Sequence, residues 1–341
     1  MTDLINALSY ELTALTSEAR RKYPEVKEPR LATIAVNCLQ HLIVHSAVSP
    51  DAIGTIVTTL GDVVSLGADV QLRTLQIVLP LLSNYPNVHD NELTLGLCYR
   101  LQESTAPMVN SIAGATFRQL INIVFDKVAR EDSAVDEPDA PHPCADDAVR
   151  LLKDLCVLTN GEPGTFLRLD GLPCTVGLEL LESILSSYEP LFRAHLPFLD
   201  LVREQLCPLI IRYFSDRHDY PKIMRLVRVI NVLIRQYHDV MVTECEIYLS
   251  MLLKMLEPDQ HPAWQRILAL ELFRGICSNF QLLYSIFTRY SNNKGKAKGI
   301  YYTLLSALDH AATETPLAFR DMAGELDPDS LLLAGTSATE E

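Results

Sequence analysis

The chain has 341 residues, 48% of them hydrophobic, which supplies cores for about two domains and excludes a wholly disordered protein. The formal net charge is −14, which by itself argues against anionic partners. However, residues 129–147 hold seven acids against one arginine, and residues 311–341 also hold seven against one. The rest of the chain is close to neutral, so local basic patches can still meet anionic surfaces.

No segment is expected to cross a membrane. Residues 31–50 carry no formal charge, but their histidines, serines, asparagine and glutamine indicate an amphipathic helix. The first twelve residues place acids early and lack the continuous apolar run of a signal peptide. The eight cysteines form no Cys-x-x-Cys pair, so we expect buried free thiols in a reducing, cytoplasmic compartment.

Helical periodicity recurs through the first part of the chain. Leucines at positions 4, 8, 12 and 15 form one face of a first helix, which ends in a basic turn before Pro24. Further helices are predicted over residues 31–46, 50–66, 69–82, 91–103 and from Asn110 or Ser111 to about 129. Residues 1–129 are therefore predicted to form one helical domain.

A domain boundary is predicted at residues 130–147. This stretch contains three prolines and seven acids and almost no large apolar side chain, so it is expected to be an acidic, proline-rich linker. A second helical domain is predicted over residues 148–312, and an acidic, disordered tail over residues 313–341. Within the second domain, helices are predicted over residues 145–159, 176–188, 196–213 with a break at Pro208, 222–257, 264–278, 280–290 and 300–312.

Residues 222–257 are predicted to form an antiparallel pair of helices that breaks near Tyr237. Thr243 and Glu246 have the spacing of a capping box at the start of the second helix. A broad apolar face of the first helix is formed by Ile223, Leu226, Val227, Ile230, Leu233, Ile234 and Tyr237. The opposite side carries three arginines, Arg225, Arg228 and Arg235.

Helical pairs of this kind recur at roughly the period of armadillo or HEAT units, and no alternating strand pattern appears. The predicted fold class is therefore all-α, an armadillo/HEAT-like right-handed helical solenoid with two halves stacked into one array.

Enzymatic motifs are missing from the sequence. It contains no P-loop, dinucleotide-binding, hydrolase or zinc-protease motif, so we expect neither an enzyme nor a cofactor. His41 and His45 lie one turn apart, but no carboxylate or thiol completes a metal site, and partly exposed core histidines are the simpler interpretation. The acids beside Cys245 are better explained by a helix cap than by an activated thiol.

Basic clusters are the remaining candidate sites. Arg20, Arg21, Lys22 and Lys27 are predicted to contact anionic lipid, although helix-end complementarity explains one or two of these cations. The stripe of Arg225, Arg228 and Arg235 is a candidate partner-binding surface, with a solvated helix face as the alternative. A loop with Lys294, Lys296 and Lys298 is a weaker lipid candidate. Nucleic acid is disfavoured because no aromatic residues alternate with these cations.

Several motifs resemble the large Golgi guanine-nucleotide exchange factors of Arf GTPases, over residues 4–312. They are Leu178–Ser183, Cys207–Ile210, Met224–Val229 and Val242–Ile247 in the second half, and Tyr23–Lys27 and Thr116–Leu120 in the first. The exchange factors carry an Asn-Tyr-Asp-Cys-Asp box where this chain has Arg289-Tyr290-Ser291-Asn292-Asn293, which shares only the tyrosine. The chain therefore looks most like the non-catalytic monensin-sensitivity branch of that family.

The resemblance implies a dimerisation and cyclophilin-binding (DCB) region followed by a homology-upstream (HUS) region, in a scaffold on the trans-Golgi network and endosomes. The implied partners are Arf and Arf-like GTPases, a Dopey-type protein with its phospholipid flippase, anionic membrane containing phosphatidic acid, and a second copy of the chain. Two alternatives stay open: the regulatory region of a catalytic exchange factor, and an unrelated helical-repeat adaptor.

Overall fold

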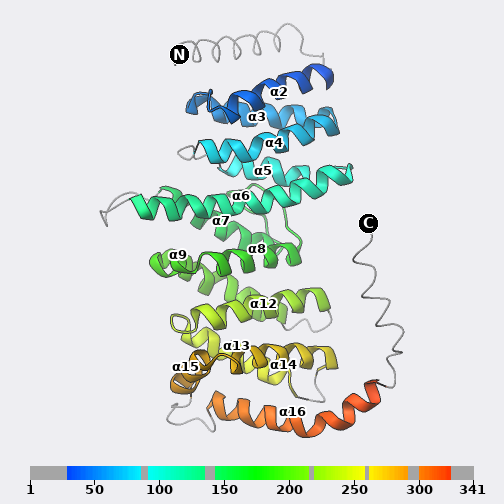
Figure 1. Ribbon diagram of the computed structural model, residues 1–341, viewed down its shortest axis with the longest axis vertical. Helices are drawn as coiled ribbons and strands as arrows, with labels where there is room; N and C mark the ends of the chain where they lie inside the picture. Colours follow the sequence, from blue (N-terminus) through cyan, green and yellow to red (C-terminus); the bar gives the residue numbers. More distant parts are fainter. Residues whose placement is uncertain are drawn as a thin grey trace. The chain divides into compact units, whose positions relative to one another are not determined.

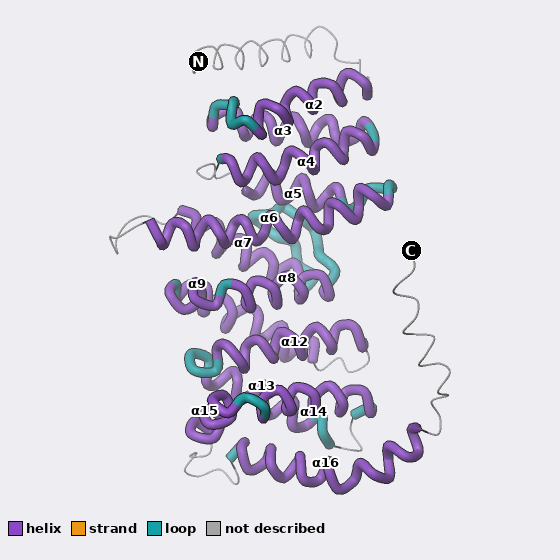
Figure 2. The backbone as a smooth tube through the Cα atoms, in the orientation of Figure 1, coloured by secondary structure: helices purple, strands orange, loops and turns teal. Residues whose placement is uncertain are grey.

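The computed structural model describes residues 29–85, 91–134, 143–214, 219–257, 261–290 and 299–323. Within these ranges every long regular element is a helix and no strand occurs, as Figure 2 shows. The predicted all-α class is confirmed. The chain divides into two compact units, residues 1–212 and 213–341, which are described separately.

The first unit is built from helices that pack in chain order (Figure 1). Helix α2 packs on α4, α4 and α5 pack on α6, and α6 packs on α7, which in turn packs on α8. Their bounds are α2 Pro29–Val44, α3 Ile53–Val63, α4 Ala68–Asn84, α5 Asn91–Leu101, α6 Pro107–Ala134, α7 Pro143–Thr159, α8 Cys174–Ser187, α9 Glu189–Ala194 and α10 Leu196–Leu201. Short 3₁₀ turns precede and follow α3, at Pro50–Ala52 and Val64–Leu66.

Aromatic side chains form part of the core of this unit. The ring of Phe125 on α6 stacks on Tyr188 at 5.3 Å between centroids and lies 6.0 Å from Phe198. The Tyr188 hydroxyl donates to the Asp126 carboxylate at 2.8 Å. Burial and this carboxylate raise the pKa of Tyr188, so the phenol stays neutral and keeps donating. These contacts attach the segment after α8 to α6.

Helix α6 starts earlier than expected. The predicted start was Asn110 or Ser111, whereas the helix begins at Pro107. Proline is favoured in the first turn because its missing N–H needs no partner there. The Ser104 hydroxyl accepts from the Ala106 N–H at 3.3 Å just before that turn. The polar residues Asn110 and Ser111 are therefore ordinary first-turn residues.

The predicted linker at residues 130–147 is helical at both of its ends. Helix α6 continues to Ala134 and α7 begins at Pro143, and residues 135–142 lie outside the described residues. The two carboxylate oxygens of Glu131 accept from the backbone N–H groups of Cys144 and Ala145, each at 3.3 Å. A carboxylate at a helix N-terminus satisfies otherwise unpaired donors and complements the helix dipole. Glu131, one of the acids that suggested a disordered linker, therefore joins α6 to the start of α7.

The break predicted at Pro208 is confirmed. Helix α10 gives way to a π-helical turn at Val202–Leu206, and α11 then runs over Cys207–Phe214. Proline has no N–H to donate to the carbonyl four residues earlier, and its ring crowds that carbonyl. The wider turn before Pro208 is consistent with this missing hydrogen bond.

The second unit contains helices α12 Tyr220–Tyr237, α13 Val242–Lys254, α14 Ala263–Cys277, α15 Phe280–Tyr290 and α16 Ile300–Ala323. Asp219 caps α12 by accepting from the Lys222 N–H at 3.3 Å. All seven residues predicted to form the apolar face of α12 are buried, and Val229 is buried with them. The helix ends at the predicted place, where the Tyr237 carbonyl accepts from the Val240 and Met241 N–H groups.

Two predictions for this unit are wrong. Helix α13 begins at Val242, and no side chain caps it, so Thr243 lies inside the first turn and the capping box with Glu246 does not form. Helix α16 continues beyond residue 312 to Ala323, into the predicted tail. The Thr313 hydroxyl bonds back to the carbonyls of Asp309 and His310, as threonine does within a helix, and so the threonine does not end the helix.

Candidate partner-binding site

The three arginines of the predicted stripe have different surroundings on α12. Arg228 and Arg235 are exposed, whereas Arg225 is half-buried and interacts elsewhere in the structure. Helix α12 packs on α14, and the two exposed arginines lie along this contact. The structure therefore brings two of the three predicted residues into one site.

A cleft of about 510 Å³ lies between α12 and α14. Its apolar floor includes Val227 and Leu272, each only 6% exposed. The charged and polar groups around the floor come from both helices. Residues of α12 that line the cleft are Met224, Val227, Arg228, Asn231 and Arg235, and those of α14 and its end are Leu268, Glu271, Leu272, Arg274, Gly275 and Ser278.

Gly275 allows the two helices to approach where Arg235 crosses. A Cβ atom at this position would come 2.5 Å from Nη2 of Arg235, closer than side-chain atoms approach each other. With glycine, the guanidinium lies directly over the backbone of α14. This close approach accounts for a glycine in the last turn of α14, although glycine is a poorer helix former than alanine.

The charge of the cleft is unbalanced. Arg274 is paired with Glu271, which lies one turn before it on α14. Neither Arg228 nor Arg235 has a carboxylate partner among the residues that the structure describes. A guanidinium group presents a planar fork of N–H donors that fits a carboxylate. The cleft can therefore bind an acidic ligand that also covers an apolar floor.

The contribution of α14 was not predicted from the sequence. Glu271, Arg274 and Gly275 lie about 40 residues after the arginine stripe, and only the packing of the helices brings them beside it. The one local signal was a glycine within a helical stretch, Gly275 in Leu272-Phe273-Arg274-Gly275-Ile276.

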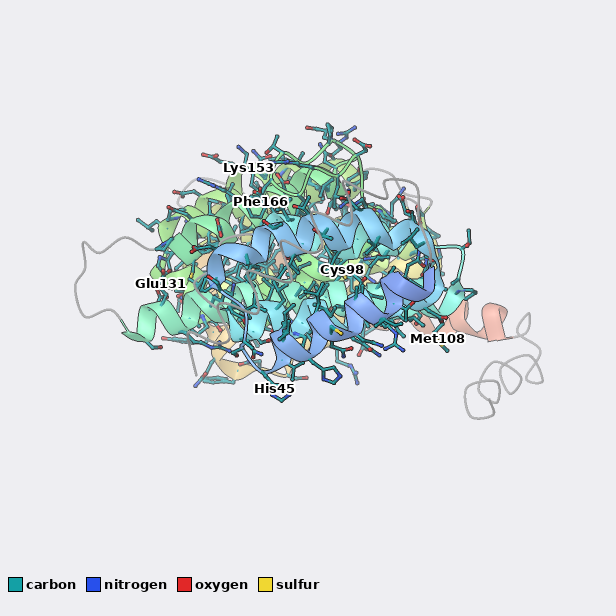
Figure 3. All side chains as sticks on the ribbon, turned by 90° about the horizontal axis from the view of Figure 1, so that it is seen from above. His45, Cys98, Met108, Glu131, Lys153 and Phe166 are labelled. Carbon is teal, nitrogen blue, oxygen red and sulfur yellow. The ribbon has the colours of Figure 1, made fainter. Side chains whose placement is uncertain are left out.

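The other predicted sites have different outcomes. Arg20, Arg21, Lys22 and Lys27 lie outside the described residues, as do Lys294, Lys296 and Lys298. His41 and His45 were predicted to be partly exposed core histidines, but both are exposed at the end of α2. Figure 3 shows the His45 ring pointing away from the helices. In the described ranges no group of three or more metal-ligating side chains could hold an ion.

The sequence predicted buried free thiols; the cysteines are free in the structure, but not all of them are buried. Cys98 lies among the helices of the first unit (Figure 3) and its thiol donates to the Ala113 carbonyl at 3.4 Å. Burial raises the pKa of Cys98 and of Cys156 to about 12 and that of Cys144 to about 11. Such thiols are protonated at neutral pH and are poor nucleophiles. Only Cys38 and Cys277 are exposed.

We expect maleimide at neutral pH to label Cys38 and Cys277 first, because a reagent can reach these thiols in the folded chain. Cys98, Cys156 and Cys245 should be labelled only after unfolding in guanidinium, where all the thiols become accessible. Peptide mass spectrometry of the labelled chain measures each site. Rapid labelling of Cys98 in the folded chain would contradict this description of the core.

None of the helices in the described residues combines the length and apolar character needed to cross a bilayer.

Comparison with known families identifies the two halves. Residues 25–132 match the sequence model described as "Mon2/Sec7/BIG1-like, dimerisation and cyclophilin-binding domain", and residues 144–298 match the model of the Mon2/Sec7/BIG1-like HUS domain. A chain whose described residues form helices without strands, and which matches both models in this order, is a DCB–HUS protein.

Several curated proteins are similar over most of the chain. The MON2 homologue of Xenopus laevis is 34% identical over 319 residues, and that of Homo sapiens is 33% identical over 319 residues. The MON2 homologue of Schizosaccharomyces pombe is 32% identical over 289 residues. Each alignment covers 83% of this chain but only 17–18% of the relative, so the chain spans less than a fifth of their length. The chain belongs to the Mon2/Sec7/BIG1-like family and is a MON2 homologue, which confirms the resemblance seen in its motifs.

Proposed function

We propose that the chain is a non-catalytic scaffold that acts in vesicle traffic between the Golgi and endosomes. The observation that carries the proposal is the pair of DCB and HUS matches in a chain similar to MON2 homologues. On this proposal the chain recruits partners of the Arf-like GTPase pathway, including a Dopey-type protein and its flippase, at the trans-Golgi network and endosomes.

The helical fold suits this role. Helices that pack on their neighbours in chain order expose long faces, and we expect them to continue as a right-handed armadillo-like solenoid. The name of the DCB domain includes dimerisation, which supports a homodimer. Arg228 and Arg235 in the α12–α14 cleft are the proposed partner contacts, and Arg225, which is half-buried outside the cleft, is a further proposed contact.

The direct test is capture of GTPases by the purified chain. Arf and Arf-like GTPases loaded with a non-hydrolysable GTP analogue should be retained by the immobilised chain, and the same proteins loaded with GDP should not. Failure to retain any of them in either state, with a Dopey-type protein also unbound, would contradict the proposed recruitment role. The regulatory region of a catalytic exchange factor remains the second candidate because its DCB and HUS domains match the same family models.

Membrane attachment is proposed to use Arg20, Arg21, Lys22 and Lys27. Each cation near an anionic surface contributes about 1 kcal/mol, so reversal of all four charges should abolish flotation with phosphatidic-acid liposomes. Circular dichroism should show unchanged helicity, and vesicles of neutral lipid should bind neither protein. Flotation that is the same for the four-glutamate variant and the original chain would rule out this attachment.

A further inference from the structure

The α12–α14 cleft combines an apolar floor with two unneutralised cations on the same edge. Arg228 and Arg235 are seven residues apart on α12, which separates them by roughly 10 Å along the helix axis. Asn231 lies between them on the same side of the cleft. The site is thus a groove with two cations two helical turns apart along one wall.

This spacing fits one kind of ligand better than others. Two acidic side chains two turns apart on a helix are also separated by roughly 10 Å, and the residues between them on that face can be apolar. A helix that lies along the groove would pair each carboxylate with one arginine and bury its apolar residues on the floor.

The opposite wall adds selectivity. Glu271 is the acidic residue in the groove lining, and its pairing with Arg274 leaves the arginines of α12 available. Gly275 leaves space for the guanidinium of Arg235, because a Cβ atom at position 275 would displace the end of that side chain. Three arginines against one glutamate favour an acidic ligand over a basic one.

We infer that the α12–α14 groove binds a helical segment of a protein partner, with two carboxylates two turns apart and apolar residues between them. This inference rests on the proposed scaffold function, because it names the class of partner segment that the scaffold would hold. The partner is defined by the charge pattern and the spacing of the groove.

The inference is tested with the whole chain and a designed probe. The probe is a fluorescein-labelled, alanine-rich helical peptide with glutamates at positions i and i+7 and leucines at i+3 and i+4. The control peptide carries lysine at both glutamate positions. Fluorescence anisotropy should show saturable binding of the acidic peptide that weakens as salt is raised, and no binding of the lysine peptide.

Four variants locate the binding. Arg228→Glu and Arg235→Glu should each weaken binding at least about tenfold, because each replaces an attraction by a repulsion. Arg150→Glu makes the same charge change at an exposed position of α7 and should leave binding unchanged. Gly275→Ala should also weaken binding by moving Arg235, whereas Gly114→Ala, whose nearest neighbour would be 3.9 Å away, should not.

Three outcomes would overturn the inference. The first is that the acidic peptide shows no saturable binding. The second is that Arg150→Glu and Arg228→Glu weaken peptide binding equally. The third is that the groove variants lose binding to anionic vesicles but still bind the peptide. The last result would assign the arginines to lipid. GTPase capture separates this inference from the proposed scaffold function. If the original chain captures a GTPase but does not bind the peptide, only the inference about the groove is contradicted. If the original chain captures no GTPase, the proposed scaffold function is contradicted.

Discussion

Replacement of Asp154 by alanine is expected to lower the free energy of unfolding of the first unit by about 4 kcal/mol. Asp154 lies on α7 and is only 2% exposed. Its carboxylate accepts from the backbone N–H groups of Thr165, at 3.1 Å, and of Phe166 and Leu167, at 2.7 Å each. These bonds hold the loop between α7 and α8 against α7.

The cost arises because alanine would leave buried N–H donors without a partner, and each hydrogen bond to a charged group contributes about 1.5–3 kcal/mol. Urea unfolding followed by circular dichroism measures the loss, and hydrogen exchange should show faster exchange at Phe166 and Leu167. Asp170→Ala removes an exposed carboxylate from the same loop and should change stability by less than about 0.5 kcal/mol. Equal stabilities of the two variants would show that the Asp154 contacts do not hold the loop.

Replacement of Gly177 by alanine is expected to destabilise the chain by about 3 kcal/mol. A Cβ atom on Gly177 of α8 would lie 1.9 Å from the hydroxyl oxygen of Thr159 and 2.8 Å from its Cβ. Thr159 ends α7 and is only 1% exposed, so it has no free space into which to move. The two helices would have to separate, and the apolar residues between them would lose contacts.

A double-mutant cycle tests this explanation. Thr159→Ala removes the hydroxyl and methyl groups, so Gly177→Ala should cost at least about 1 kcal/mol less in that background than in the original chain. Gly114→Ala on α6 meets nothing closer than 3.9 Å and serves as the matched control, with stability unchanged or slightly raised. Additive effects of the two α7–α8 substitutions would exclude a direct clash between them.

The apolar face of α12 could be predicted because helical periodicity can be recognised within a short stretch of sequence. Residues 223–237 repeat at helical spacing, and a helix of that length must bury its apolar face. The break at Pro208 was predictable for a similar reason, since proline disrupts a helix wherever it lies in the interior.

The wrong boundaries depended on partners that are distant in the sequence or on competing local bonds. Glu131 looked like one acid of a disordered linker, but it caps α7 from thirteen residues away. Thr243 and Glu246 had the spacing of a capping box, yet the backbone turn after Tyr237 starts α13 before Thr243. Composition alone does not show which of several possible caps and helix starts forms in the folded chain.

The candidate site was half predictable. Charge periodicity identified Arg228 and Arg235, but not that Arg225 lies outside the groove or that α14 supplies its other wall. Helix–helix packing determines both facts, and it depends on the shapes of side chains along two whole helices. The sequence around Gly275 does not show why a glycine is needed there, because the reason is the guanidinium of Arg235 on another helix.

We propose that the chain acts as a scaffold region of a MON2-type protein. The most direct measurement replaces the matching region of Saccharomyces cerevisiae MON2, which is 26% identical to this chain over 303 residues, with residues 1–341. The tagged chimera should colocalise with a trans-Golgi marker in cells without their own MON2, and deletion of the inserted region should disperse it. A stable chimera that is as dispersed as the deletion would contradict the proposed scaffold role.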